Sequence, residues 1–68
     1  MNYTRRELKQ METIEQAWDG SELKIEDDGV RVWLTNSDNR SYDGDYQIET
    51  RINGSWHSKS YLEGGEEF

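Results

Sequence analysis

Alternating apolar and polar positions predict a β-hairpin over residues 45–62. Every second residue from Tyr46 to Ile52 is apolar or β-branched, and the residues between them are polar or charged. Side chains of a strand alternate between its two faces, so this arm has one apolar face. Asn53-Gly54 follows, and an Asn-Gly pair between two alternating segments is the strongest short-range hairpin signal. The hairpin is therefore expected to turn at these two residues.

The register of this hairpin has two solutions. A two-residue turn pairs Arg51 with Trp56 and sends Trp56 to the polar face. A three-residue loop over 53–55 pairs Ile52 with Trp56 instead, which moves Trp56 to the apolar face and, further along, sets Glu49 opposite Lys59. Turn chemistry favours the first register, whereas the hydrophobic pattern and the charge pairing favour the second. We expect the second register.

An earlier hairpin is predicted over Glu22–Thr35, with its turn at Asp28-Gly29. A two-residue turn gives a self-consistent register that gathers the apolar residues on one face. Trp33 falls on the other, outer face, beside the side chain of Lys24. The residues expected on the core face are Leu23, Ile25, Val30, Val32 and Leu34.

The N-terminal segment predicts a helix over about residues 5–18. Thr4 and Glu7 match the capping-box pattern, in which each residue bonds the backbone amide of the other. Gly20 lies where a glycine that ends a helix is expected. An apolar stripe at helical spacing follows the cap and consists of Leu8, Met11, Ile14 and Trp18.

These elements predict an α+β domain in which one N-terminal helix packs on a four-stranded antiparallel sheet. The two hairpins build the sheet, the order is α-β-β-β-β, and helix and sheet form two layers. Residues 36–44 are polar turn formers and are read as a long loop, with a short edge strand around 40–42 as an alternative. Residues 1–62 form the single domain, and residues 63–68 form a flexible acidic tail.

Length and composition limit the ways in which this domain can be stabilised. The chain has 68 residues and no cysteine, so neither a disulfide nor a cysteine-based zinc site is available. A core of this size rarely supplies more than ~3–5 kcal/mol. No apolar run reaches the ~20 residues of a membrane span, and the first residues lack the apolar core of a secretory signal. We expect a cytoplasmic protein.

The charge distribution bears on the choice of partner. The net charge is −7, but residues 1–10 carry a local +2 and the other 58 residues a local −9. Such an acidic body repels nucleic acid and favours a basic partner surface. Arg5 and Arg6 stand in the first helical turn, where acids are preferred. Either they pair with carboxylates of the sheet or they contact a partner.

The sequence gives little support for catalysis or for a cofactor. Asn39, Ser41 and Asp43 resemble the first ligands of an EF-hand loop, but Thr50 stands where the bidentate glutamate belongs. His57 is the only histidine, and no motif accompanies it. We therefore expect no enzyme activity, no cofactor and no metal site.

The remaining features predict a small acidic, non-enzymatic binding protein. It would block a basic, nucleic-acid-binding surface of a protein partner, as a mimic of nucleic acid. In size, charge and lack of catalytic groups the chain is similar to phage-encoded inhibitors of host defence nucleases, including anti-CRISPR and anti-restriction proteins. The residues expected to contact the partner are Asp27, Asp28, Trp33, Asp38, Asp43, Asp45, Arg5 and Arg6.

The alternative is a homodimer that serves as a structural or adaptor module. Its contact would be the outer aromatic face of the sheet, with Trp33 and either Trp56 or Tyr61 as anchors, because aromatic residues are enriched among interface hot spots. The two hypotheses differ in salt dependence, since only the first relies on charge.

Overall fold

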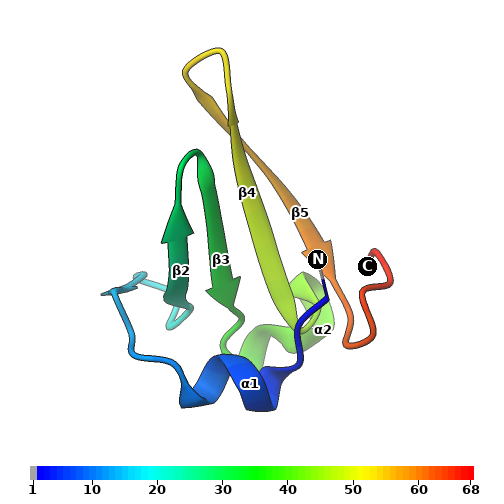
Figure 1. Cartoon of the computed structure of the whole chain (residues 1–68). Helices are drawn as coiled ribbons and strands as arrows, with labels where there is room; N and C mark the ends of the chain where they lie inside the picture. The colour runs from blue at the N-terminus through cyan, green and yellow to red at the C-terminus, as the bar shows by residue number, and fades with distance from the viewer. Residues whose placement is uncertain (1) are drawn as a thin grey trace.

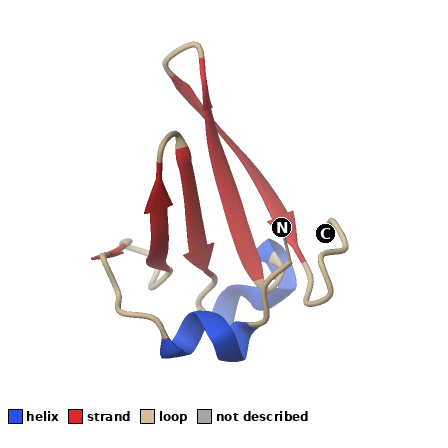
Figure 2. Ribbon diagram, viewed as in Figure 1, coloured by secondary structure: helices blue, strands red, loops and turns tan. Residues whose placement is uncertain are grey.

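The computed structural model describes residues 2–68. One antiparallel sheet takes its five strands in chain order, β1-β2-β3-β4-β5, and each strand pairs with the next (Figures 1 and 2). The elements are α1 (Arg5–Gln10), β1 (Glu15–Gln16), β2 (Glu22–Asp27), β3 (Val30–Leu34), a 3₁₀ turn (Ser37–Asn39), α2 (Arg40–Asp43), β4 (Tyr46–Ile52) and β5 (Ser55–Tyr61). The predicted α+β class with an N-terminal helix on an antiparallel sheet is confirmed, but the sheet has five strands and not four.

The N-terminal helix begins as predicted and ends early. Thr4 and Glu7 form the capping box, with both reciprocal bonds present. The helix stops at Gln10 because Met11 adopts an extended conformation (φ −81°, ψ 150°). The amide of Ile14 then donates to the carbonyl of Leu23 at 2.8 Å, which commits this segment to the sheet. The predicted helix over 11–18 is therefore wrong, and part of it forms the extra strand β1.

The first hairpin turns at the predicted residues but contains an unpredicted bulge. The expected pairs hold from Asp27–Val30 to Ile25–Val32, after which the register shifts between Leu23 and Ile25. Leu23 now lies opposite Trp33, on the face away from Val32. The prediction of Leu23 on the core face is wrong, although the side chain is buried. The bulge also turns Lys24 inward, where Nζ donates to Thr13 Oγ1 at 2.7 Å and to the Met11 carbonyl at 3.0 Å.

The second hairpin adopts the two-residue turn, so the three-residue register is wrong. Ile52 pairs with Ser55, and Arg51 pairs with Trp56. Asn53 and Gly54 both have positive φ, 50° and 81°, as a type I′ turn requires. Turn chemistry thus decides the register, and Trp56 lies on the outer face.

The core occupies one end of the sheet, where α1 crosses it (Figure 1). Leu8 of α1 packs with Val32, Leu34 and Tyr46, and all four are buried. The ring of Tyr46 stacks on that of Tyr61, with a centroid distance of 5.4 Å. The β4–β5 hairpin extends well past the β2–β3 turn, so its far end lies outside this core.

The connection before β4 is more ordered than predicted, and the C-terminal segment folds back on the sheet. Residues 36–44 form the 3₁₀ turn and α2, so both the long loop and the short edge strand are wrong. The last residues fold back along β5: Tyr61 pairs with Glu67, and the amide of Phe68 donates to the Ser60 carbonyl at 2.8 Å. The flexibility of residues 63–68 stays a prediction.

Candidate partner-binding surface

Arg5 is a structural residue and not a surface contact. Its side chain lies under the first turn of α1, 6% exposed, and Nη1 donates to the carbonyls of Thr35 at 2.8 Å and Asp45 at 3.0 Å. Burial lowers the pKa of this guanidinium, and the charge of Arg40 lowers it further. Arg6, the next residue, is exposed. Of the two arginines, only Arg6 is placed to reach a partner.

The predicted acidic residues do not come together. Asp27 and Asp28 are exposed at the β2–β3 turn, at the end of the sheet away from α2 (Figure 1). Asp38 is exposed on the 3₁₀ turn, and Asp43 is half-buried at the end of α2. Asp45 is only 7% exposed and holds the guanidinium of Arg40 and the amide of Glu63. The carboxylate of Asp45 therefore serves the fold and is not offered to a partner.

Trp33 lies on the outer face, as predicted, but it is half-buried. Its neighbours across the sheet are Leu23 of β2 and Gln47 of β4, in place of the expected Lys24. The indole Nε1 donates to Glu49 Oε1 at 2.5 Å. This bond holds the indole ring against β4.

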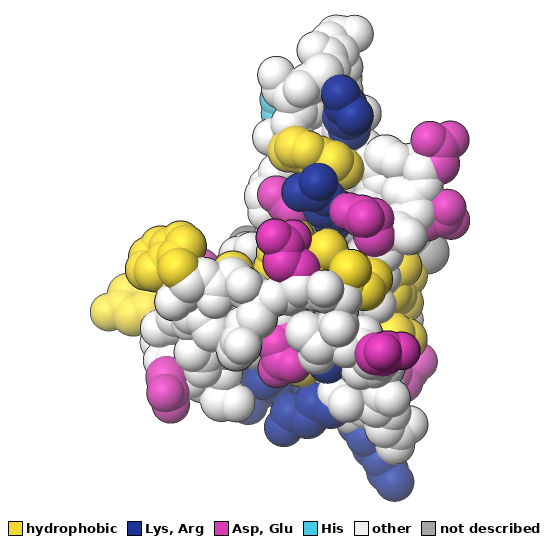
Figure 3. Space-filling view, turned by 90° about the vertical axis from the view of Figure 1, so that its left-hand side faces the viewer, with side chains coloured by type: hydrophobic (Ala, Val, Ile, Leu, Met, Phe, Trp, Pro, Cys, Tyr) yellow, Lys and Arg dark blue, Asp and Glu magenta, His cyan; other side chains and the backbone are white. Residues whose placement is uncertain are grey.

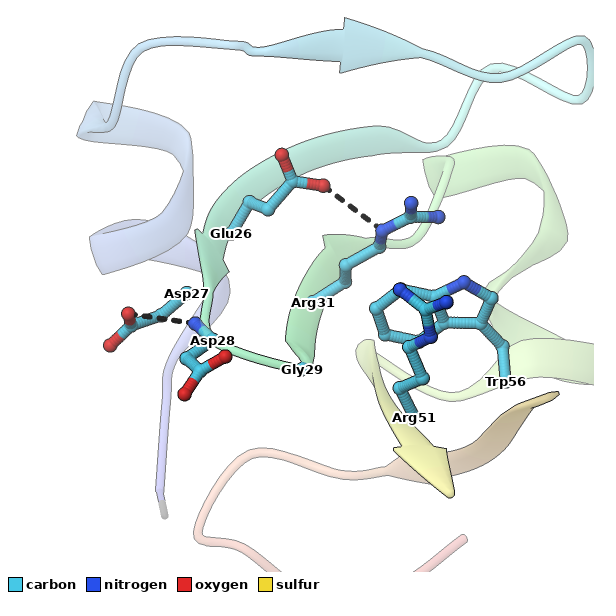
Figure 4. A pocket seen from close by; sticks show the side chains of 7 residues that line it. All are labelled: Glu26, Asp27, Asp28, Gly29, Arg31, Arg51 and Trp56. Carbon is cyan, nitrogen blue, oxygen red and sulfur yellow. Dashed lines mark hydrogen bonds and ion pairs between the residues drawn. The ribbon is translucent and has the colours of Figure 1, made fainter. Parts of the chain in front are cut away.

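Trp56 forms one wall of an open hollow beside the β2–β3 turn. The guanidinium carbon of Arg31 lies 4.0 Å from the centre of the indole ring, a cation–π contact, and Arg31 Nε bonds Glu26 Oε2 at 3.0 Å. The hollow has a volume of about 690 Å³, and Figure 4 shows its lining side chains, which come from β2, β3, β4 and β5. They are Glu26, Asp27, Asp28, Gly29, Arg31, Arg51 and Trp56.

Trp18 is the most exposed large hydrophobic residue that the structure describes, at 99%. The sequence places it in the helical stripe that faces the core, and this interpretation is wrong. It stands in a tight turn in which Ala17 N donates to the Ser21 carbonyl at 2.8 Å and Gly20 N donates to the Ala17 carbonyl at 3.0 Å. The Asp19-Gly20 pair is a turn signal that could have revealed this position.

The rest of the fold holds the Trp18 turn firmly. Asn36 Nδ2 donates to the Asp19 carbonyl at 2.7 Å, and the Asp19 carboxylate accepts from the amide of Ser21 at 2.9 Å. Gly20 has φ +90°, and a Cβ there would lie 2.2 Å from Asn36 Nδ2. A side chain at position 20 would displace the Asn36 amide that bonds the Asp19 carbonyl. The turn that carries Trp18 is thus anchored on both sides of the indole.

The segment that carries Trp18 is acidic. Residues 12–22 include four acids and no base, and Ile14 in the same segment is 55% exposed. A hydrogen bond from the Thr13 hydroxyl, followed by the nearby Lys24, lowers the pKa of Glu22. Figure 3 shows hydrophobic side chains projecting at one edge of this side of the molecule and acidic ones scattered over it.

Among residues 2–68, no group of three or more His, Cys, Asp or Glu side chains is placed to hold a metal ion. No helix within the same residues is long and apolar enough to cross a membrane. Comparisons with models of protein families, with curated proteins and with solved structures found no match.

Proposed function

We propose that this chain is a small acidic, non-enzymatic binding protein that docks on a basic surface of a protein partner and blocks it. The exposed Trp18 carries the proposal. A tryptophan that is 99% exposed contributes nothing to a thin core, yet several hydrogen bonds fix the turn on which it stands. Such a pre-organised aromatic side chain loses little conformational entropy when a partner buries it.

The magnitude of this burial is large enough to anchor a complex. A tryptophan buries about 150–250 Å² of surface, and apolar burial contributes about 25 cal/mol per Å², which gives roughly 4–6 kcal/mol as an upper value. Ile14, on the same loop, adds to the apolar contact. The Trp18 turn thus acts as a hot spot, and Trp33 does not.

The surrounding acids supply direction and selectivity. Carboxylates near Trp18 and at Asp27 and Asp28 attract a basic surface and raise the association rate, and this effect weakens as salt increases. A protein that binds nucleic acid presents lysines and arginines spaced to meet phosphates. A nucleic-acid-handling protein is therefore the partner that fits best, as it is for phage-encoded inhibitors of defence nucleases.

Photo-crosslinking from position 18 tests the proposal. Trp18 is replaced by p-benzoylphenylalanine, and Tyr42, which is 80% exposed on α2, is replaced in the matched control. We expect one protein to crosslink from position 18 and not from position 42. Once purified, the crosslinked protein should bind nucleic acid, and adding this chain should release the nucleic acid. No crosslink specific to position 18, or a partner that keeps its nucleic acid, would refute the proposal.

A homodimer formed through the outer face is the second candidate. The two-residue turn of the β4–β5 hairpin supports it, because Trp33 and Trp56 then share one face of the sheet. This dimer would lose affinity on Trp33→Ala, with little dependence on salt. Molecular mass measured by light scattering over a range of concentrations decides between the candidates: a monomer at all concentrations removes the second.

A further inference from the structure

A second hollow lies between the Trp18 turn and the outer face of the sheet, and its volume is about 120 Å³. Sites for small molecules have volumes of about 300–1,000 Å³, so this hollow is too small for a ligand of that kind. Its size fits one side chain of a partner. The lining residues are Ala17, Asp19 and Ser21 from the turn, and Trp33, Gln47 and Glu49 from the sheet.

Both walls of this hollow are held in place by hydrogen bonds within the chain. On the sheet, Trp33 Nε1 donates to Glu49 Oε1 at 2.5 Å. In the turn, the Asp19 carboxylate accepts from the amide of Ser21 at 2.9 Å, and the Asp19 carbonyl accepts from Asn36 Nδ2 at 2.7 Å. A pre-organised site of this kind loses little conformational entropy when a side chain enters it.

Open hydrogen-bond acceptors belong to the lining side chains. Among residues 2–68, Asp19 Oδ2 and Glu49 Oε2 have no hydrogen-bond partner, and neither has Gln47 Oε1. The indole N–H of Trp33 is already used by Glu49. A group with several N–H donors and no acceptor complements such a lining, and the guanidinium of arginine is such a group.

The two acids of the hollow also lack an ion-pair partner within the described residues. Arg31 of β3 lies opposite Glu49, but its guanidinium bonds Glu26 and contacts the Trp56 ring. Asp19 and Glu49 are both half-buried, so solvent screens their attraction for a cation less than it does on an open surface. The ion pairs among residues 2–68 are Lys24–Glu22, Arg31–Glu26 and Arg40–Asp45.

We propose that this hollow receives an arginine side chain of the protein partner beside Trp18. The guanidinium binds the carboxylates of Asp19 and Glu49, and the indole of Trp33 provides a surface for a cation–π contact. The identity of the partner rests on the proposed function, whereas the choice of side chain rests on this hollow. Trp18 then supplies the apolar anchor, and the hollow selects a partner surface that presents an arginine next to an apolar patch.

Titration with a blocked arginine tests the hollow without any partner. N-acetyl-arginine amide carries its only charge on the side chain, and N-acetyl-citrulline amide is the uncharged control of similar shape. Binding is followed by NMR at the indole N–H of Trp33, which lines the hollow. We expect a saturable shift, with a dissociation constant at least tenfold lower for the arginine compound. N-acetyl-lysine amide should bind less tightly than the arginine compound, because an ammonium lacks the planar fork of donors.

Two double variants separate the hollow from the net charge of −7. Asp19→Asn/Glu49→Gln removes both charges of the hollow and keeps an oxygen for each existing hydrogen bond. Asp27→Asn/Asp28→Asn removes the same charge at the β2–β3 turn, where both acids are exposed. We expect the first variant to bind the arginine compound at least tenfold less tightly and the second to stay within about twofold of wild type.

Equal affinity for the arginine compound and either of the other two compounds would overturn the proposal, and so would an equal loss in the two double variants. Trp18→Ala should leave the affinity for the arginine compound unchanged, because Trp18 does not line the hollow. Failure of the crosslinking from position 18 would refute the proposed function and leave this titration as it is. Failure of the titration would refute the arginine site and leave the docking through Trp18 in place.

Discussion

Replacing Arg5 with alanine should destabilise the domain far more than the same change at Arg6. The two arginines are adjacent in the first turn of α1, and both lie against the preferred charge of that helix end. Arg5 is buried and donates to two backbone carbonyls, whereas Arg6 is exposed. The pair therefore separates the effect of the buried hydrogen bonds from that of the charge.

The magnitude follows from the acceptors that are left behind. A buried carbonyl without its partner costs about 1–3 kcal/mol. In Arg5→Ala the Asp45 carbonyl still accepts a long hydrogen bond from the amide of Thr35, at 3.4 Å. The lost hydrogen bond therefore costs less free energy at this carbonyl than at the Thr35 carbonyl. We expect Arg5→Ala to lower the free energy of unfolding by roughly 2–4 kcal/mol, most of the ~3–5 kcal/mol that a core of this size supplies.

Urea unfolding followed by tryptophan fluorescence measures this difference. Arg6→Ala should change the free energy of unfolding by less than about 0.5 kcal/mol, because exposed charges contribute little. The free energy of unfolding of Arg5→Lys should lie between those of the two alanine variants, since an ammonium group reaches one carbonyl but cannot span both. If Arg5→Ala unfolds at the same urea concentration as Arg6→Ala, the role assigned to the buried guanidinium is wrong.

Three further changes probe the loops that position Trp18 and the core. Gly20→Ala should destabilise the protein more than Gly54→Ala in urea unfolding: both glycines have positive φ, but only the first meets a neighbour, Asn36 Nδ2 at 2.2 Å. Thr13→Val should raise the pKa of Glu22, measured by NMR titration. Because the folded-state pKa of Glu22 is lowered, its contribution to stability is present at neutral pH and is lost as the pH falls, so the stability difference between Thr13→Val and wild type should shrink from pH 7 to pH 3. Thr35→Val should leave stability unchanged or raise it by about 1 kcal/mol, because Oγ1 of this 2%-exposed residue has no hydrogen-bond partner among the described residues.

Local sequence signals predicted the turns correctly and the helix length incorrectly. The turns at Asp28-Gly29 and Asn53-Gly54 depend on the backbone freedom of a few adjacent residues, which the sequence displays directly. Ile14 and Trp18 have helical spacing, but spacing alone does not show that the segment pairs with Leu23. Whether this segment forms a helix or a strand depends on long-range hydrogen bonds, so the helical spacing predicted the wrong element.

The candidate surface was less predictable than the fold. Asp45 and Arg5 are charged and were expected at a partner contact, but each is buried because it satisfies backbone groups that the fold brings together. Trp18 was assigned to the core for the opposite reason, as a large apolar residue. Trp18 is exposed because α1 already ends at Gln10. No residue of the helical stripe is a helix-breaking signal that would have predicted this early end.

The most direct test of the proposed function is the dissociation constant of the complex between this chain and the purified partner, measured at increasing NaCl concentrations. We predict that wild-type affinity falls as salt rises, because carboxylates steer the contact. Trp18→Ala should weaken binding at least tenfold at every salt concentration without changing thermal stability, while Tyr42→Ala binds as wild type. Affinity that is independent of salt and equal in Trp18→Ala and wild type would contradict the account.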